Sequence, residues 1–168
     1  TAIFPDWMDR LAALREAAPL LGADPGERIP PFILVDYGRL DTGLNTEGLT
    51  LATITGVDRL ANWAGLDPAA ARARREAWMD RLIGAVDAAF PGLAGAVRTR
   101  EMATAASMAR PLNTPDGAIY GFAPHREAGG PLERGPRTPL PGLLHASAFT
   151  GGGGFTGAMM GGAAAARA

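Results

Sequence analysis

The sequence predicts an α+β fold, in which a mixed sheet with helices is followed by a terminal strand, loop and helix. Three observations indicate this class. Apolar residues recur at helical spacing after Asp6, residues 32–35 form a continuous apolar run, and residues 151–154 are four successive glycines. The glycines separate a short apolar run at residues 143–148, predicted to be a strand, from a segment of very small side chains. This order is typical of a tight connection between a strand and a helix.

The first helix is predicted to begin at Asp6, whose carboxylate can accept a hydrogen bond from the first turn. Gly22 is a suitable residue to end it. Between them, apolar residues recur at intervals of three and four, as on one face of a helix. The resulting amphipathic face consists of Trp7, Leu11, Leu14, Ala18 and Leu21.

Two strands are predicted next. Residues 29–37 contain the apolar run of positions 32–35, and residues 49–55 are rich in β-branched side chains. Polar turn residues at 41–48 separate the two segments. We therefore expect a hairpin-like pair within the mixed sheet.

A second helix is predicted from Asp67 and Pro68, because an acid at the cap followed by proline favours a helix start. Pro91 and Gly92 are expected to end it. Residues 97–102 are then predicted as a strand, and residues 104–124 as irregular. The buried face of this helix is predicted to comprise Trp78, Leu82, Val86 and Phe90.

Composition limits the function classes. The chain has 168 residues, of which 47% are hydrophobic, so it can bury the core of one domain. Its formal net charge of −1 provides no basic field, and nucleic acid is therefore not expected as a partner. The absence of cysteine excludes disulfides and thiolate catalysis from this sequence. The two histidines, His125 and His145, do not form the cluster that a metal site requires.

A membrane span has to be considered for residues 139–166, where His145 is the sole ionisable residue. The four glycines would interrupt such a span, and most of its apolar residues are alanine and glycine. No transmembrane segment is therefore expected. We expect a cytoplasmic protein, with association to a membrane surface left open.

The predicted strand, loop and helix at the end of the chain have features of a ligand-binding site. Glycines expose backbone N–H groups that no Cβ shields, and the start of a helix adds a positive dipole end at the same place. Donors are expected at Gly153, Gly154 and Phe155, with the hydroxyl of Thr156 nearby. Such a site suits a flat, phosphorylated or partly anionic group.

The same residues resemble a known family. Residues 138–162, with Thr-Pro-Leu-Pro-Gly-Leu, an apolar run, the glycine run and a Gly-Ala segment, are similar to the C-terminal flavin-binding segment of the phytoene desaturase, carotenoid isomerase and retinol saturase family of FAD-dependent oxidoreductases. Residues 116–121, Asp-Gly-Ala-Ile-Tyr-Gly, resemble that family's GAxYG element. Where the family usually carries glycine in the strand, this chain has Ser147.

The resemblance implies FAD as cofactor and assigns the segments. Residues 1–115 would belong to the substrate domain, residues 116–137 would form a connection, and residues 138–168 would return to a Rossmann-type FAD domain, so that the whole enzyme would be α/β. Tyr120 and His125 are the candidate catalytic residues. The implied cofactor-binding residues are Ser147, Ala148, Thr150, Gly152, Gly153, Gly154, Phe155 and Thr156.

The adenosine half of the FAD site must come from elsewhere, because no strand followed by G-x-G-x-x-G opens this chain. The resemblance thus implies a C-terminal subunit or fragment whose N-terminal FAD-binding half is a separate chain or a cleaved fragment. The expected activity is hydride transfer of the desaturase, saturase or isomerase type on an apolar or polyene-like small molecule. Two alternatives are a flavin amine oxidase component and a non-catalytic partner subunit of a flavoprotein.

Overall fold

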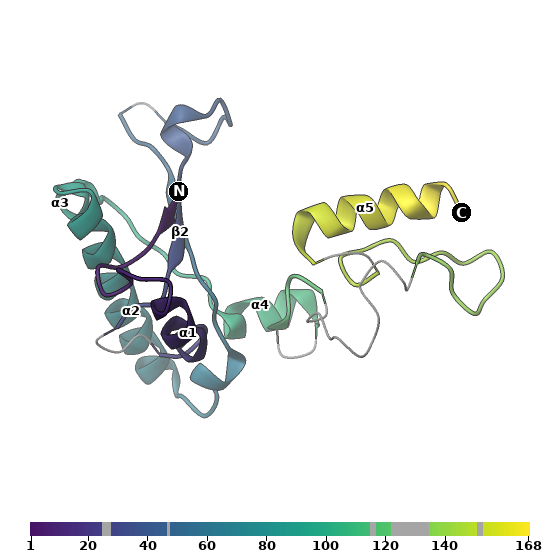
Figure 1. Cartoon of the computed structure of the whole chain (residues 1–168), viewed down its shortest axis with the longest axis horizontal. Coiled ribbons are helices and arrows are strands. Elements are labelled where there is room, and N and C mark those ends of the chain that lie inside the picture. The colour runs from purple at the N-terminus through teal and green to yellow at the C-terminus, as the bar shows by residue number, and fades with distance from the viewer. Residues whose placement is uncertain (25–27, 47, 115–116, 122–134, 151–152) are drawn as a thin grey trace. The chain divides into compact units, whose positions relative to one another are not determined.

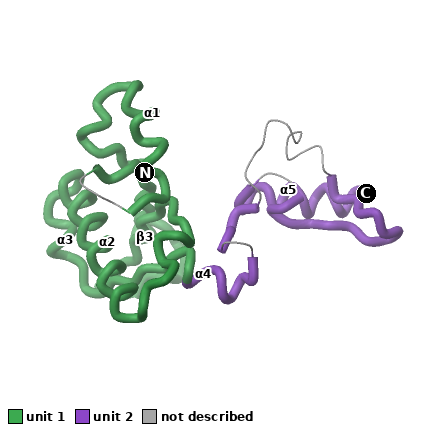
Figure 2. The backbone as a smooth tube through the Cα atoms, turned by 90° about the horizontal axis from the view of Figure 1, so that it is seen from below, with its two compact units in different colours: residues 1–106 green, residues 107–168 purple. Residues whose placement is uncertain are grey.

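The structure, a computed structural model, describes residues 1–24, 28–46, 48–114, 117–121, 135–150 and 153–168 (Figure 1). The chain divides into two compact units, Thr1–Ala106 and Ser107–Ala168, which are coloured separately in Figure 2. The first contains a sheet covered by a long helix, and the second is built around the C-terminal helix. The predicted α+β class is confirmed at this level.

The sheet has three strands in the order β1-β2-β3, namely Ala2–Ile3, Phe32–Asp36 and Ala52–Thr55. Both pairs are antiparallel, with Ile3 opposite Phe32 and Leu34 opposite Ile54. The two predicted strands are therefore confirmed, but the prediction of a mixed sheet is wrong for the described residues. A parallel pair requires a long crossover connection, whereas β2 and β3 follow each other through a turn-rich segment with one short 3₁₀ helix, η2 (Tyr37–Arg39).

The core of the first unit lies between one face of this sheet and α2 (Pro68–Ala89). Alternate residues of β2 point to this face, so Phe32 and Leu34 are buried together with Ile3 and Val86. Ile33 points the other way and is 50% exposed. Packing against α2 thus determines which face of the strand is buried.

The start of α2 agrees with the prediction. The Asp67 carboxylate accepts a hydrogen bond of 2.8 Å from the N–H of Ala70, and Pro68 occupies the first helical position. Trp78 is buried against Trp63, which follows η3 (Leu60–Asn62), with ring centroids 5.2 Å apart in an edge arrangement. The prediction for Phe90 is wrong, since the helix ends before it and its side chain is 44% exposed.

The predicted helix from Asp6 is much shorter than expected. Helical structure is limited to α1 (Ala13–Ala17) and the following η1 (Ala18–Leu20). The buried residues are Ala13 and Ala17, whereas Leu11 is 84% exposed. The spacing of the larger apolar residues therefore predicted the wrong buried face. The face that packs on the rest of the unit carries the two alanines.

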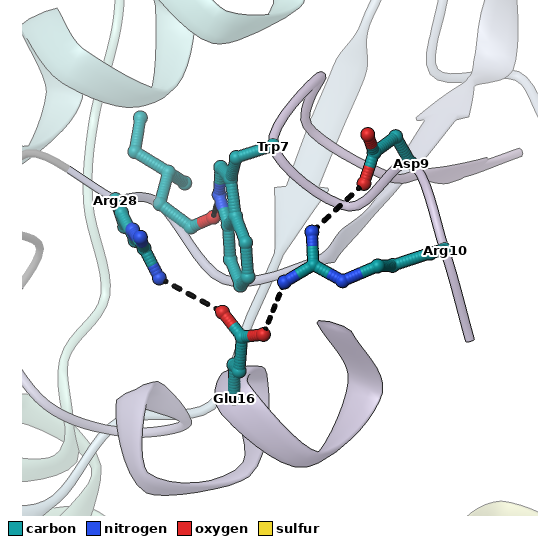
Figure 3. A network of polar contacts seen from close by, with 6 residues as sticks. Trp7, Asp9, Arg10, Glu16 and Arg28 are labelled. Atoms are coloured by element: carbon teal, nitrogen blue, oxygen red, sulfur yellow. Dashed lines mark hydrogen bonds and ion pairs between the residues drawn. The ribbon is translucent and has the colours of Figure 1, made fainter. Parts of the chain in front are cut away.

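Side-chain contacts hold the segment before α1 in place of helical hydrogen bonds (Figure 3). The Trp7 indole N–H donates to the carbonyl of Ile29 over 3.0 Å, and the Arg28 guanidinium lies 5.3 Å from the Trp7 ring centroid. Glu16 pairs with Arg28 at 3.1 Å and with Arg10 at 2.6 Å. These contacts fix the turn before α1 to the segment that leads into β2.

The segment after α2 also differs from its prediction. α3 (Leu93–Ala96) follows a left-handed Gly92, and the predicted strand at 97–102 is an irregular segment attached to α2. Arg100 makes this attachment through Asp80 at 2.5 Å and Glu76 at 2.8 Å, and these hydrogen bonds raise the pKa of Arg100 above its ordinary value. Within the region expected to be irregular, α4 (Ala105–Leu112) forms.

Asp58 is the acceptor that joins several of these segments. One carboxylate oxygen accepts from the Trp63 indole and from the N–H of Ala105, both at 2.7 Å. The other accepts from the N–H of Arg59 and from the Asn62 amide. The loop before α2 and the start of α4 therefore depend on one carboxylate.

We predict that Asp58→Ala lowers the free energy of unfolding by about 2 kcal/mol, because the indole N–H of the buried Trp63 loses its acceptor. Urea denaturation followed by circular dichroism measures this change. Asp58→Asn keeps one acceptor oxygen and should have the smaller effect. Equal stability of Asp58→Ala and the parent chain would contradict the assignment.

Candidate functional site

The candidate site lies within the second unit, where residues 117–121 meet the turn at 147–150 and the start of α5 (Gly154–Ala166). The prediction of a strand at 143–148 is wrong. This segment forms a single bridge, from Leu144 to Arg137, and then turns. A strand needs neighbours to satisfy its backbone groups, and the described part of this unit offers none. No Rossmann-type sheet is present in the described residues.

A hydrogen-bonded turn takes the place of the predicted strand end. The buried Thr150 hydroxyl donates to the carbonyl of Ser147 over 2.8 Å and accepts from the Ser147 N–H over 3.1 Å. The Ser147 hydroxyl accepts from the N–H of Phe149 and lies 3.1 Å from Nε2 of His145. The polar atoms of two implied cofactor-binding residues are therefore bonded within the turn itself.

The helix α5 packs on this turn through glycines. Gly157 and Gly161 are its buried residues. A Cβ at Gly161 would lie 2.8 Å from the Ser147 carbonyl oxygen and 3.0 Å from the Thr150 hydroxyl, so a larger residue would force the turn away. The small residues of α5 consequently permit close packing of a helix on backbone.

Residues of the GAxYG-like element lie against Gly153 and Gly154. The N–H of Gly154 donates to the carbonyl of Tyr120 over 3.0 Å. A Cβ at Gly153 would come within 2.5 Å of that same carbonyl oxygen. At Gly121, where φ is +93°, a Cβ would lie 2.2 Å from the carbonyl oxygen of Ala148. The two segments that carry the family resemblance are thus in direct backbone contact.

These contacts change the interpretation of the glycines. The sequence suggested that Gly153 and Gly154 expose backbone for a ligand, but the space next to both is occupied by Tyr120. Gly152 lies outside the described residues. The missing Cβ atoms are therefore required by the chain's own packing, and they do not by themselves indicate a cofactor.

The first turn of α5 retains donors that a ligand could use. Gly153 is the N-cap and provides no side-chain cap. The first N–H groups of any helix have no partner within the helix, and here that of Gly154 is bonded to Tyr120. Phe155 and Thr156 are exposed in this turn, with 83% exposure at Phe155. Their amides and the helix dipole suit the anionic edge of a ligand.

The polar groups near the start of α5 decide how far these residues fit FAD. The amides of Phe155 and Thr156 suit the carbonyl edge of a flavin ring, whereas Ser147, Thr150 and Gly154 have their polar groups engaged elsewhere. The fit is thus limited to the exposed first turn, because the carbonyl of Ala148 is packed against Gly121.

A G-x-G-x-x-G spacing is present at Gly152, Gly154 and Gly157, near the end of the chain and not at its start. In dinucleotide-binding domains this spacing follows a strand of a βαβ unit. Here the residues before it form the 147–150 turn. The spacing alone therefore does not define a phosphate site.

The two candidate catalytic residues are Tyr120 and His125. The Tyr120 side chain is 54% exposed, and its ring lies close to Gly154. His125 lies outside the described residues. No group of three or more potential metal ligands occurs among the residues that the structure describes.

The second unit lacks a hydrophobic core in its described part. Its buried residues there are three glycines and Thr150, and no large apolar side chain is buried. Many large side chains are instead at least 40% exposed. They are Leu112, Ile119, Tyr120, Leu140, Leu143, Leu144, Phe155, Met159 and Met160.

Comparison with known proteins adds no assignment. No protein-family model matches this chain, and no match was found among curated proteins or solved structures. Within the described residues, no helix has the length and apolar character needed to cross a membrane. Because none of these comparisons found a match, the resemblance to the phytoene desaturase family stays a prediction.

We predict that Gly153→Ala accelerates hydrogen exchange at the Gly154 amide by about tenfold, because the added Cβ displaces the Tyr120 carbonyl that this amide contacts. NMR-detected exchange of the full chain measures the effect. Gly162→Ala is the matched control, since a Cβ at Gly162 meets nothing within 4 Å. The same exchange rate in both variants would contradict the described contact.

Proposed function

We propose that this chain is the C-terminal portion of an FAD-dependent oxidoreductase similar to the phytoene desaturase, carotenoid isomerase and retinol saturase family. One observation carries the proposal. The two segments that resemble this family, 116–121 and 138–162, are far apart in sequence, yet they meet through the Gly154–Tyr120 hydrogen bond and the Gly121–Ala148 approach. Contact between them is what a shared cofactor site requires.

The proposed contact with FAD uses the first turn of α5. The amides of Phe155 and Thr156 would donate to the carbonyl edge of the flavin ring, where negative charge develops on reduction. When bound, FAD supplies hydride acceptance or donation. This chain would orient an apolar or polyene-like substrate and hold the ring edge, with residues 1–115 on the substrate side.

The proposal includes a second polypeptide that supplies the N-terminal half of the FAD site. Exposed apolar side chains of the second unit support this part, because a unit with no buried large apolar residue in its described part gains little stability by itself. A partner that covers Phe155, Met159 and Met160 would supply the missing burial. The proposed location is the cytoplasm, with association to membranes as the source of an apolar substrate.

A second candidate is a non-catalytic subunit of a flavoprotein. The internal hydrogen bonds of Ser147, Thr150 and Gly154 favour it, because these groups would otherwise be available to a cofactor. In this alternative the second unit serves as an interaction surface. The two candidates differ in whether the assembled protein holds a flavin through this chain.

We predict that the tagged chain, purified from its native host under mild conditions, is recovered with a second polypeptide and a flavin absorption band. Gel electrophoresis, mass spectrometry and the visible spectrum measure these outcomes. A colourless complex would favour the non-catalytic subunit. A colourless, folded and monodisperse chain without a partner would contradict both candidates.

We predict that Phe155→Asp weakens FAD binding by that assembly about tenfold relative to Phe155→Asn, because a carboxylate next to the helix start repels the anionic ring edge. An acidic residue in the first turn stabilises the helix, so loss of folding would not explain the result. Equilibrium titration of the flavin-free assembly with FAD measures the difference. Equal affinities of the two variants for FAD would show that the first turn of α5 does not contact the flavin.

A further inference from the structure

A hollow of about 430 Å³ lies on the first unit between α2, α3 and the segment that follows α3. All of its lining residues belong to the first unit. Its volume is within the range of about 300–1,000 Å³ that is usual for small-molecule sites. The hollow is therefore large enough for a small organic ligand.

The apolar part of the hollow is built from α2 and the start of the following segment. Ile83 and Val97 line it and are both half-buried, and Ala94 adds a small side chain from α3. Gly84 also lines it, and a Cβ at this position would meet nothing within 4 Å. The apolar wall is thus open toward the hollow at the glycine.

Two arginines line the hollow, and they differ in their partners. Arg100 is bonded to Asp80 and Glu76, so its charge is neutralised by two carboxylates. Arg98 is exposed, and no hydrogen bond or ion pair of Arg98 occurs among the described residues. One guanidinium next to an apolar wall is therefore left to bind an anion. Its planar donors match a carboxylate in a bidentate arrangement.

We propose that this hollow binds a small amphipathic carboxylate, with its hydrocarbon part against Ile83 and Val97 and its carboxylate on Arg98. The apolar wall excludes a strongly hydrated ion such as a free dicarboxylate as the preferred ligand. Arg98, the one lining arginine without a partner in the part of the chain that the structure describes, selects one negative charge. The site needs no flavin, so this proposal and the proposed redox function can fail independently.

The test uses the full chain and octanoate as the probe. Saturable shifts of the Ile83 and Val97 methyl signals are expected in NMR titrations with octanoate. Octan-1-ol and octylammonium, which have the same hydrocarbon length, are expected to bind at least about tenfold more weakly. Absence of saturable shifts with octanoate, or equal binding of all three molecules, would overturn the proposal.

Variants test the two parts of the site separately. Arg98→Gln should weaken octanoate binding about tenfold, while Arg72→Gln, at an exposed arginine of α2 that does not line the hollow, should leave it unchanged. Gly84→Leu fills the open wall and should abolish binding, and Ala94→Leu provides a second blocking variant from α3. Circular dichroism verifies the fold of each variant. Undiminished binding in Arg98→Gln, or in both folded blocking variants, would overturn the assignment.

Discussion

The arrangement of the second unit depends on backbone approaching backbone at three glycines. Gly121 faces the Ala148 carbonyl, Gly153 faces the Tyr120 carbonyl, and Gly161 faces the turn at Ser147. Each approach is shorter than a Cβ allows, so the contacts between residues 117–121, 147–150 and α5 exist because these side chains are absent. The approach at Gly153 also brings the Tyr120 carbonyl to the Gly154 N–H, so this donor at the start of α5 is not left for a ligand.

Different forces stabilise the interior of each unit. The first buries Phe32, Leu34 and Val86 in a conventional contact between a sheet and a helix, and the hydrophobic effect stabilises it. In its described part, the second relies on hydrogen bonds and glycine packing, with large apolar residues at its surface. This contrast is the physical reason for proposing that a partner covers the second unit.

Local signals in the sequence predicted some elements well. Asp67 and Pro68 marked the start of α2, since a cap acts within one turn and needs no distant residue. The start of α5 after the glycine run and the apolar run of β2 were likewise predicted. The strand predictions at 97–102 and 143–148 are wrong, because within the described ranges no strand lies beside these residues to pair with them. The helix predicted from Asp6 is limited to Ala13–Ala17, and it buries two alanines in place of the larger apolar residues.

Local sequence accounts for the Asp67 cap of α2, the chain breaks and the glycine content, because each depends on the conformational preference of one or two neighbouring residues. It also indicated which segments resemble a flavin site. Tertiary structure alone decided that the strands are antiparallel and that Arg98, unlike Arg100, is left without a partner among the described residues. It also decided that Tyr120 occupies the space beside Gly153. These outcomes depend on contacts between distant residues, whose distances no local pattern encodes.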